Sequence, residues 1–419
     1  MIYWRLKNLF IVPAALVFLG GTFFESHAQE KEETKGTLAE PLDAAEVRSQ
    51  IALVEKLRDV VPDRGALLYF LSISKQHLGE TREALSLLKD CLALREGFDP
   101  SGDPAFKGLR ESKEFMELVE DVHRDFPVVA QARLAFVTEE KDLIPEGLAY
   151  SPEQTTFYLS SLNRKKIVKI NGQGRAADFG PAGQEKLFPI LGIRPHPSDG
   201  TIWANSFSED GGKTELLHFD GNGELLGRYA PKDTAPHGFN DLVVLKNGEI
   251  ILTDSLANTV WRFEPRKETF SPLKLYRPLI YPNGIAISDD QQIFIADTVG
   301  IVRMDLTKGT SSDVNPGPRS TLASIDGLYW HAGSLVGVQN GIGSPRVAMF
   351  RLSKDGSRIV QTTVLENRSP FTILPTTGAI KGNDFYFIAN SQLDNLNGDR
   401  ILDTTRLERV RIAVVHLQQ

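Results

Sequence analysis

The stretch GFNDLVVLKNGEIILTDS, residues 238–255, recurs in outline twice further along the chain. Residues 282–298 read PNGIAISDDQQIFIADT, and residues 325–340 read IDGLYWHAGSLVGVQN. Each copy has a polar residue near its start, a short apolar run, a turn, a second apolar run and a polar end. The opening polar residues Asn240, Asn283 and Asp326 follow one another at intervals of 43 residues. A period in the forties, with several short strands in each repeat, is typical of the blades of a β-propeller.

Three weaker copies extend this pattern on both sides. Alignment on the opening position adds Glu146, Leu191 and Thr377. The sequence therefore predicts a mainly β fold, a six-bladed β-propeller over residues 132–419. The segments ARLAFVTEE (132–140) and RVRIAVVHL (409–417) are expected to pair and close the ring, because closure removes free sheet edges.

Residues 44–128 have a different, helical periodicity. Apolar residues such as Leu67, Leu71, Leu85 and Leu88 recur at three- and four-residue intervals. A turn at Gly79, followed by two small residues seven apart (Ala84 and Cys91), resembles a tetratricopeptide repeat. Only one full copy is visible, whereas such solenoids need about three repeats to be stable alone. We therefore expect a small helical, tetratricopeptide-like cap on the propeller, while a partner-binding module stays open as the alternative.

The first 28 residues read as a signal peptide. Arg5 and Lys7 precede an apolar run over residues 9–24, and the small residues Ser26 and Ala28 fit a cleavage site. Residues 29–43 are charged, lack apolar spacing and are expected to form a flexible lead. We therefore expect a periplasmic or secreted protein without stable membrane insertion after cleavage, with an uncleaved anchor as the alternative.

Charge and cysteine content narrow the possible partners and sites. The chain of 419 residues has a formal net charge of −7 and no basic stripe, which argues against a nucleic-acid partner. Its single cysteine, Cys91, excludes intramolecular disulfides and multi-thiolate metal sites.

Four of the six openings carry an oxygen donor: Glu146, Asn240, Asn283 and Asp326. Because the innermost strands of a propeller start at one end of the channel, these side chains are expected to converge. Two carboxylates and two amide oxygens suit a hard cation, above all Ca²⁺, although another divalent metal is possible. Each residue taken alone is better explained by a turn before a strand, but their common register favours a metal site.

The motifs PEGLAY (145–150), GFNDLVV, PNGIAISDDQQIFIADT and SIDGLYW (324–330) resemble the regucalcin/gluconolactonase (senescence marker protein) family over about residues 132–419. The resemblance implies that Glu146, Asn240, Asn283 and Asp326 bind a divalent metal, commonly calcium. It also implies that Asp326 is the catalytic base. A cation in such a site polarises a carbonyl, so the expected activity is hydrolysis of a small lactone or ester.

Some positions differ from the family pattern. Sugar-lactone members carry Arg two residues before the first Asn, and Gly238 stands here, which puts aldonolactone specificity in doubt. His237 lies three residues before Asn240 and is a second candidate catalytic residue, as a base or a substrate ligand; a loop histidine without such a role is the alternative. Asp254 and Asp297, which end the second strands of their repeats, are interpreted as turn-forming residues.

Two other function classes remain open on the sequence. One is a non-catalytic propeller that binds a ligand or protein, with the helical segment as an interaction module for a protein partner. The other is a relative of strictosidine synthase, which would not need the row of four oxygen donors.

Overall fold

The computed structural model describes residues 44–180, 187–208, 213–398 and 400–418. The expected signal peptide (1–28) and flexible lead (29–43) lie outside the described residues. Within the ranges described, no helix is both long and apolar enough to cross a membrane.

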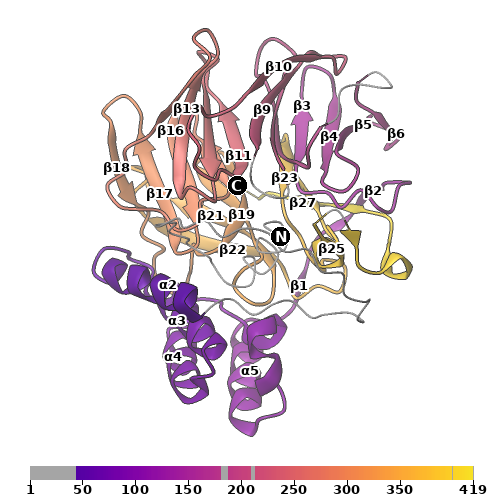
Figure 1. Ribbon diagram of the computed structural model, residues 1–419. Helices are drawn as coiled ribbons and strands as arrows, with labels where there is room; N and C mark the ends of the chain where they lie inside the picture. The colour runs from indigo at the N-terminus through magenta and orange to yellow at the C-terminus, as the bar shows by residue number, and fades with distance from the viewer. Residues whose placement is uncertain (1–43, 181–186, 209–212, 399, 419) are drawn as a thin grey trace, which may run out of the picture.

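The described chain forms a six-bladed β-propeller preceded by four α-helices, so the predicted fold is confirmed (Figure 1). Blades 1 to 5 are built in chain order from the axis outward, and their first strands contact one another around the ring. The strands of blades 1 to 3 are β3 (Leu148–Ser151), β4 (Thr156–Ser161), β5 (Lys166–Ile170) and β6 (Ala176–Asp178); β7 (Ile190–Pro195), β8 (Ile202–Phe207), β9 (Thr214–Phe219) and β10 (Leu225–Tyr229); and β11 (Phe239–Val244), β12 (Ile250–Asp254), β13 (Thr259–Glu264) and β14 (Thr269–Pro272).

The remaining blades complete the ring. Blades 4 and 5 contain β15 (Ile285–Ile287), β16 (Gln292–Asp297), β17 (Gly300–Asp305) and β18 (Thr310–Asp313), then β19 (Ile325–His331), β20 (Ser334–Gln339), β21 (Arg346–Leu352) and β22 (Ile359–Asn367). Blade 6 contains β23 (Gly378–Lys381), β24 (Asp384–Ile388), β27 (Arg411–His416) and β2 (Arg133–Val137). A small hairpin of β25 (Leu396–Asn397) and β26 (Arg400–Ile401) and two short 3₁₀ turns, η3 (Leu393–Asn395) and η4 (Thr404–Arg406), lie between β24 and β27.

The two ends of the propeller pair as the sequence predicts. Strand β2 runs antiparallel to β27, with Arg133 opposite Val414 and Val137 opposite Arg411. The sequence did not predict that β1 (Val129–Ala130) pairs with β22 at the outer edge of blade 5. The segment that leaves the helices is therefore fixed to two neighbouring blades.

Glycines after the opening positions allow the inner strands to approach closely. A Cβ atom on Gly147 would lie 2.1 Å from the carbonyl oxygen of Leu191 in the next blade. The equivalent distances are 2.5 Å from Gly192 to the oxygen of Asn240 and 2.5 Å from Gly284 to that of Asp326. These contacts are too short for any side chain, which explains why Gly occupies these three positions.

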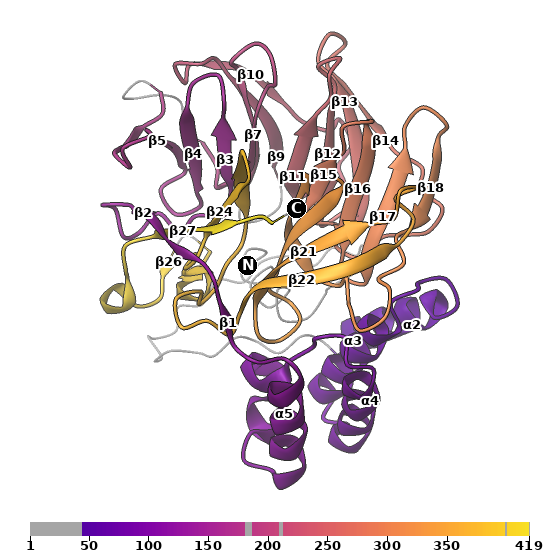
Figure 2. The ribbon, with the colours of Figure 1, turned by 180° about the vertical axis from the view of Figure 1, so that it is seen from behind.

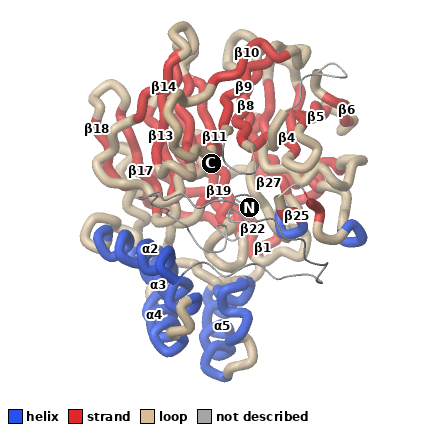
Figure 3. Tube along the Cα trace, viewed as in Figure 1, coloured by secondary structure: helices blue, strands red, loops and turns tan. Residues whose placement is uncertain are grey.

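The cap consists of α2 (Ala44–Leu57), α3 (Arg64–His77), α4 (Thr81–Ala93) and α5 (Lys113–Asp125), with the 3₁₀ turns η1 (Pro100–Gly102) and η2 (Pro104–Leu109) before α5. Helices α3 and α4 form a hairpin whose turn places Gly79 at a φ of 75°, in the left-handed region that favours glycine. Ala84 and Cys91, the two small residues, are fully buried. Figures 2 and 3 show these helices together at one end of the propeller.

The cap packs on the face where the inner strands begin. Its hydrophobic core includes four residues from propeller loops, namely Ile280, Val299, Ala323 and Ile342. Asp63 joins the two parts, because one carboxylate oxygen accepts from the Ala66 N–H at the start of α3 (2.9 Å) and the other accepts from Thr321 Oγ1 (2.7 Å) and the Leu322 N–H (2.9 Å). The position of this cap decides what surrounds the opening residues.

Candidate functional site

The six opening positions stand at or just before the first strand of their blades, at the end of the channel that the cap covers. The four oxygen donors come from blades 1, 3, 4 and 5. All four side chains are buried; they are Glu146, Asn240, Asn283 and Asp326. Leu191 and Thr377 hold the same position in blades 2 and 6.

These four residues line two cavities that share walls. Glu146 and Asn240 line the larger one, of about 310 Å³, and Asn283 and Asp326 line the smaller one, of about 50 Å³. Tyr281 and Asn340 line both cavities. The four predicted ligands thus line two neighbouring cavities, two ligands in each.

Several oxygens at this site have no hydrogen-bond partner within the protein. They are both carboxylate oxygens of Glu146, Oδ1 of Asn283 and Oδ1 of Asp326, and all are buried. Leaving a buried polar oxygen unpaired is costly, and two such carboxylates cost more. A divalent cation would offset this cost, so the residues present fit a hard metal ion.

Amide oxygens are essential to this assignment. No cluster of three or more His, Cys, Asp and Glu side chains that could hold a metal occurs in the described parts of the chain. A metal ion at this site would therefore have to be bound by the amide oxygens of Asn240 and Asn283 as well as by the two carboxylates.

Burial raises the pKa of both carboxyl groups at the site. Burial, and then the charges of Asp326 and Asp241, raise the pKa of Glu146 well above its usual range. Burial likewise raises the pKa of Asp326 to about 7, although the side-chain amides of Asn340 and Asn283 act in the opposite direction. Two buried carboxyl groups in this arrangement favour either a proton or a cation between them.

Residues that directly follow the second strands hold two of the ligands. In blade 3, Asn240 Nδ2 donates to Ser255 Oγ (3.1 Å), and that hydroxyl donates to the carbonyl oxygen of Pro282 (2.6 Å). In blade 5, Asn340 Nδ2 donates to Asp326 Oδ2 at 2.6 Å. One oxygen of Asp326 is thereby fixed, and the other is left free.

The backbone is strained at the approach to three of the ligands. Ile144, Tyr281 and Ser324 each lie two residues before a ligand and have φ values of 47°, 50° and 51°. Non-glycine residues rarely adopt this region, and bulky or β-branched ones least of all. Such strain costs on the order of 1–3 kcal/mol per residue and is concentrated at functional sites.

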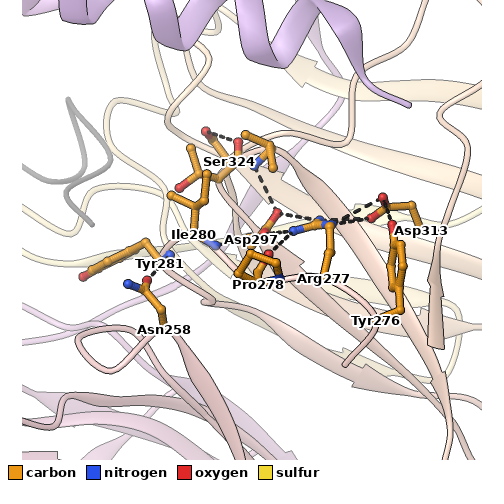
Figure 4. A network of polar contacts seen from close by, with 11 residues as sticks. Asn258, Tyr276, Arg277, Pro278, Ile280, Tyr281, Asp297, Asp313 and Ser324 are labelled. Atoms are coloured by element: carbon orange, nitrogen blue, oxygen red, sulfur yellow. Dashed lines mark hydrogen bonds and ion pairs between the residues drawn. The ribbon is translucent and has the colours of Figure 1, made fainter. Parts of the chain in front are cut away.

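A buried ion-pair network holds the loop that carries Tyr281 and Asn283 (Figure 4). Arg277 Nη1 donates to Asp297 Oδ2 at 2.6 Å, and Arg277 Nη2 lies 3.0 Å from Asp313 Oδ1. Asp297 also accepts from the N–H groups of Ile280 and Val299, both at 3.1 Å. The sequence predicts a turn-forming role for Asp297. Asp297 does accept from the turn, but it also fixes the loop before Asn283.

The structure does not bring His237 into either cavity. Its Nδ1 lies 2.6 Å from Asp254 Oδ2, and its Nε2 lies 2.9 Å from Asp233 Oδ1. The ring is buried and is not among the described side chains that line the two cavities. Both ring nitrogens are therefore occupied by carboxylates, as expected for a histidine that holds its loop.

Gly238 and Asp241 flank Asn240 and differ in their surroundings. Gly238 lines the larger cavity, and a Cβ atom there would lie 2.8 Å from Leu256 Cγ, so a long side chain would require Leu256 to move. Asp241 Oδ2 accepts from Arg194 Nη2 at 2.8 Å. This ion pair links blades 2 and 3 beside the ligands.

Tyr281, Asn340 and the cap residues at the site were not predicted from the sequence. The place of Asn340 at the site could have been inferred from the sequence, because Asn340 follows the second strand of its repeat as Ser255 does. Tyr281 and the cap had none, since their place at the site depends on long-range packing.

Comparisons with known proteins found similar solved structures but no similar sequence. No family model matches the chain, and no curated protein matches its sequence. Among solved structures it is similar to a gluconolactonase from Xanthomonas campestris, with 18% identity, a TM-score of 0.44, and coverage of 65% of this chain and 86% of that one. It is also similar to the PQQ-bound aldose sugar dehydrogenase of Streptomyces coelicolor, with 15% identity, a TM-score of 0.47, and coverage of 68% and 97%.

A third similar structure is virginiamycin B lyase from Staphylococcus aureus, with 17% identity, a TM-score of 0.44, and coverage of 61% of this chain and 80% of that one. Similarity at these identities and TM-scores does not choose among the activities named for these three proteins.

Proposed function

We propose that this protein is a divalent-metal-dependent hydrolase of small lactones or esters, with calcium as the preferred ion. The observation that carries the proposal is the set of buried, unpaired oxygens on Glu146, Asn283 and Asp326. Oxygens without partners at a cavity are the arrangement that a hard cation requires, and the larger of the two neighbouring cavities, which Glu146 lines, has room for a small substrate.

In this proposal Glu146, Asn240, Asn283 and Asp326 hold the ion. When bound, a divalent ion would polarise a carbonyl oxygen and lower the pKa of a water molecule. The protein's own contribution is to fix the donors before the reaction, through the Asn340–Asp326 and Asn240–Ser255 hydrogen bonds.

Asp326 is the proposed base. Asn340 holds its Oδ2, so the free Oδ1 is oriented to accept a proton from an attacking water. Tyr281 is a candidate donor near both carboxylates. Burial, and then the charges of Glu146 and Asp326, raise the pKa of Tyr281 far above its usual range, so its phenol keeps its proton.

The proposal is tested with Asp326→Asn on a panel of lactones and aryl esters, with excess Ca²⁺ or with a chelator. We expect a loss of kcat of about 10²–10⁴-fold, the usual contribution of a general base. Asp199→Asn, on the exposed hairpin at the opposite face, is the matched control and retains wild-type turnover. Undiminished hydrolysis by Asp326→Asn would exclude its role as base.

Metal binding has a test that does not depend on turnover. Addition of Ca²⁺ to the chelator-treated protein should raise its stability by about 2.7 kcal/mol at 100 times Kd, because the ion binds only the folded site. Glu146→Gln should reduce this shift. An equal shift in wild type and Glu146→Gln would place the ion elsewhere.

A second candidate function is a binding propeller without catalysis, in which the cap contacts a protein. One observation favours it: a cavity of about 270 Å³ lies between α4 and α5 and is lined by residues of both helices. Calcium binding without hydrolysis of any panel substrate would favour this alternative. Export through a cleaved signal peptide also remains part of the proposal, and sequencing the N-terminus of the mature protein tests it.

A further inference from the structure

The larger cavity has an apolar side next to the proposed metal ligands. In blade 2 the opening position is Leu191, which lies beside Phe207. Ile373, Leu374 and Leu393 come from the loops of blade 6. One side of this cavity is therefore lined by oxygen donors and the other side by apolar side chains.

The cap supplies another wall of this cavity. Residues 102–104, from the last residue of η1 to the first residue of η2, line it together with Gly343 and Pro345 of blade 5. The two sides are joined by backbone hydrogen bonds, from the Asp99 N–H to the oxygen of Ile342 (3.0 Å) and from the Ser344 N–H to the oxygen of Asp99 (2.9 Å). The cap loop is thus attached to the propeller beside the site.

The charges around both cavities disfavour an anionic substrate. Neither cavity has a Lys, Arg or His among the described residues that line it. The charged residues that do line them are acidic: Asp103, Glu146 and Asp394 in the larger, and Asp297 and Asp326 in the smaller. A carboxylate or phosphate on the substrate, away from the ion, would be repelled.

Few hydrogen-bonding groups are left for a polyhydroxylated substrate. The Nδ2 groups of Asn240 and Asn340 donate to Ser255 and Asp326, and Asp103 already accepts from Tyr69 Oη (2.8 Å) and the Ala105 N–H (2.9 Å). Selection of a polyol requires site groups that pair with its hydroxyls. Apolar contact is the main recognition that this cavity offers.

We propose that the larger cavity selects neutral lactones or esters with an apolar chain or ring substituent, and that the cap loop 102–104 forms part of this specificity site. The inference rests on the proposed hydrolytic function. The reacting carbonyl would lie toward Glu146 and Asn240, and the apolar substituent toward Leu191, Phe207 and Ile373.

The test uses a series of γ-lactones with alkyl substituents of increasing length, together with an aldonolactone. In the wild-type protein, kcat/KM should rise by about fourfold per added methylene until the cavity is full, which corresponds to about 0.8 kcal/mol per buried CH₂. The aldonolactone should be a poor substrate.

Two variants of exposed residues alter the apolar lining with little risk to the fold. Ile373, which is 58% exposed, and Pro104, also exposed, are replaced in Ile373→Ser and Pro104→Ser. Both should flatten the dependence of kcat/KM on the length of the alkyl chain. Leu226→Ser on β10 and Val60→Ser in the cap are matched controls, since these residues are 55% and 44% exposed and lie outside the cavity.

A binding measurement separates this inference from the proposed function. Non-hydrolysable γ-alkyl lactams of the same chain lengths are titrated by calorimetry against the full chain. Lactam affinity that rises with chain length, without turnover of any lactone, would support the apolar site and overturn the hydrolase. Turnover with equal chain-length dependence in wild type, Ile373→Ser and Pro104→Ser, or a preference for the aldonolactone, would overturn the inference.

Discussion

Blades 3 and 4 fix equivalent loops with different cationic side chains. In each blade an aspartate ends the second strand and fixes the loop that leads to the opening Asn. Asp254 of blade 3 pairs with His237, and Asp297 of blade 4 pairs with Arg277. Asp254 and Asp297 are both fully buried, and each also accepts from backbone N–H groups.

This difference shows which part of the repeat is constant. The acceptor stays at the end of the second strand, where the strand geometry fixes it, while the donor comes from a loop and can vary. Arg277 is charged at every accessible pH, whereas a histidine such as His237 can lose its proton as the pH rises. The blade 4 loop is therefore held permanently, and the blade 3 loop is held in a way that depends on pH.

The largest effect is expected from Arg277→Met. The Arg277 side chain is 1% exposed, and its removal would leave two buried carboxylates, Asp297 and Asp313, without their cation. Breaking a buried ion pair in this way costs about 3–5 kcal/mol, which urea unfolding would measure. The Ca²⁺-dependent stabilisation should also decrease, because the loop carries Asn283.

Two further variants control this prediction. Arg277→Met combined with Asp297→Asn should recover part of the lost stability, since one unpaired charge is removed. Arg351→Met, at an exposed arginine of blade 5, should change stability by no more than about 0.5 kcal/mol. A loss of only this size in Arg277→Met would contradict the importance of the network.

A smaller effect is expected from His237→Gln. The shorter amide cannot reach both Asp254 and Asp233, so about 1–3 kcal/mol should be lost. Turnover should fall less than about tenfold, because removal of a general base costs about 10²–10⁴-fold. A larger loss at unchanged stability would restore the catalytic role that the sequence suggested. His416→Gln, at an exposed His–Asp pair of blade 6, is the control.

The comparison of the two blades also predicts a difference in pH dependence. Burial by itself lowers the pKa of His237, but the hydrogen bonds and charges of Asp254 and Asp233 outweigh it, and the pKa is raised above 6.5. The stability from this pair is therefore fully present below pH 6.5 and is lost as the pH rises through the raised value.

Unfolding free energies at pH 6 and pH 9 measure this difference. The cost of His237→Gln should be smaller at pH 9 than at pH 6. The cost of Arg277→Met should not fall between pH 6 and pH 9, because Arg277 keeps its charge throughout this range. Equal costs at both pH values for His237→Gln would show that its ring is held without a charge.

The sequence predicted the parts of the molecule that repeat. The 43-residue interval located Asn240, Asn283 and Asp326, and the terminal strands paired as expected. These features follow from local patterns, because an apolar run between polar residues is enough to indicate an inner strand. The four oxygen donors were found together for the same reason.

Other parts of the site depend on contacts between distant residues. The cap is fixed to blade 5 by Asp63 and Thr321, which are 258 positions apart in the chain. No periodicity in residues 44–128 indicates which propeller face they cover. The sequence also did not indicate that Arg277 pairs with Asp297, because Arg277 lies in a loop and not at a position that recurs in the repeats.

The smallest effect is expected where the two blades touch. Asn258, in the turn between β12 and β13 of blade 3, accepts from the Tyr281 N–H of the blade 4 loop at 2.7 Å. Its φ of 52° lies in the left-handed region. Asn258→Gly keeps this backbone freedom and loses only the hydrogen bond, at about 1 kcal/mol, whereas Asn258→Ala should lose about 1 kcal/mol more. Because the bond positions strained Tyr281 rather than a metal ligand, both variants should weaken substrate affinity more than the Ca²⁺-dependent stabilisation. A larger loss of Ca²⁺-dependent stabilisation than of substrate affinity would mean that blade 3 supports the ion through this loop. The two blades would then be less independent than their separate pairs, His237–Asp254 and Arg277–Asp297, indicate.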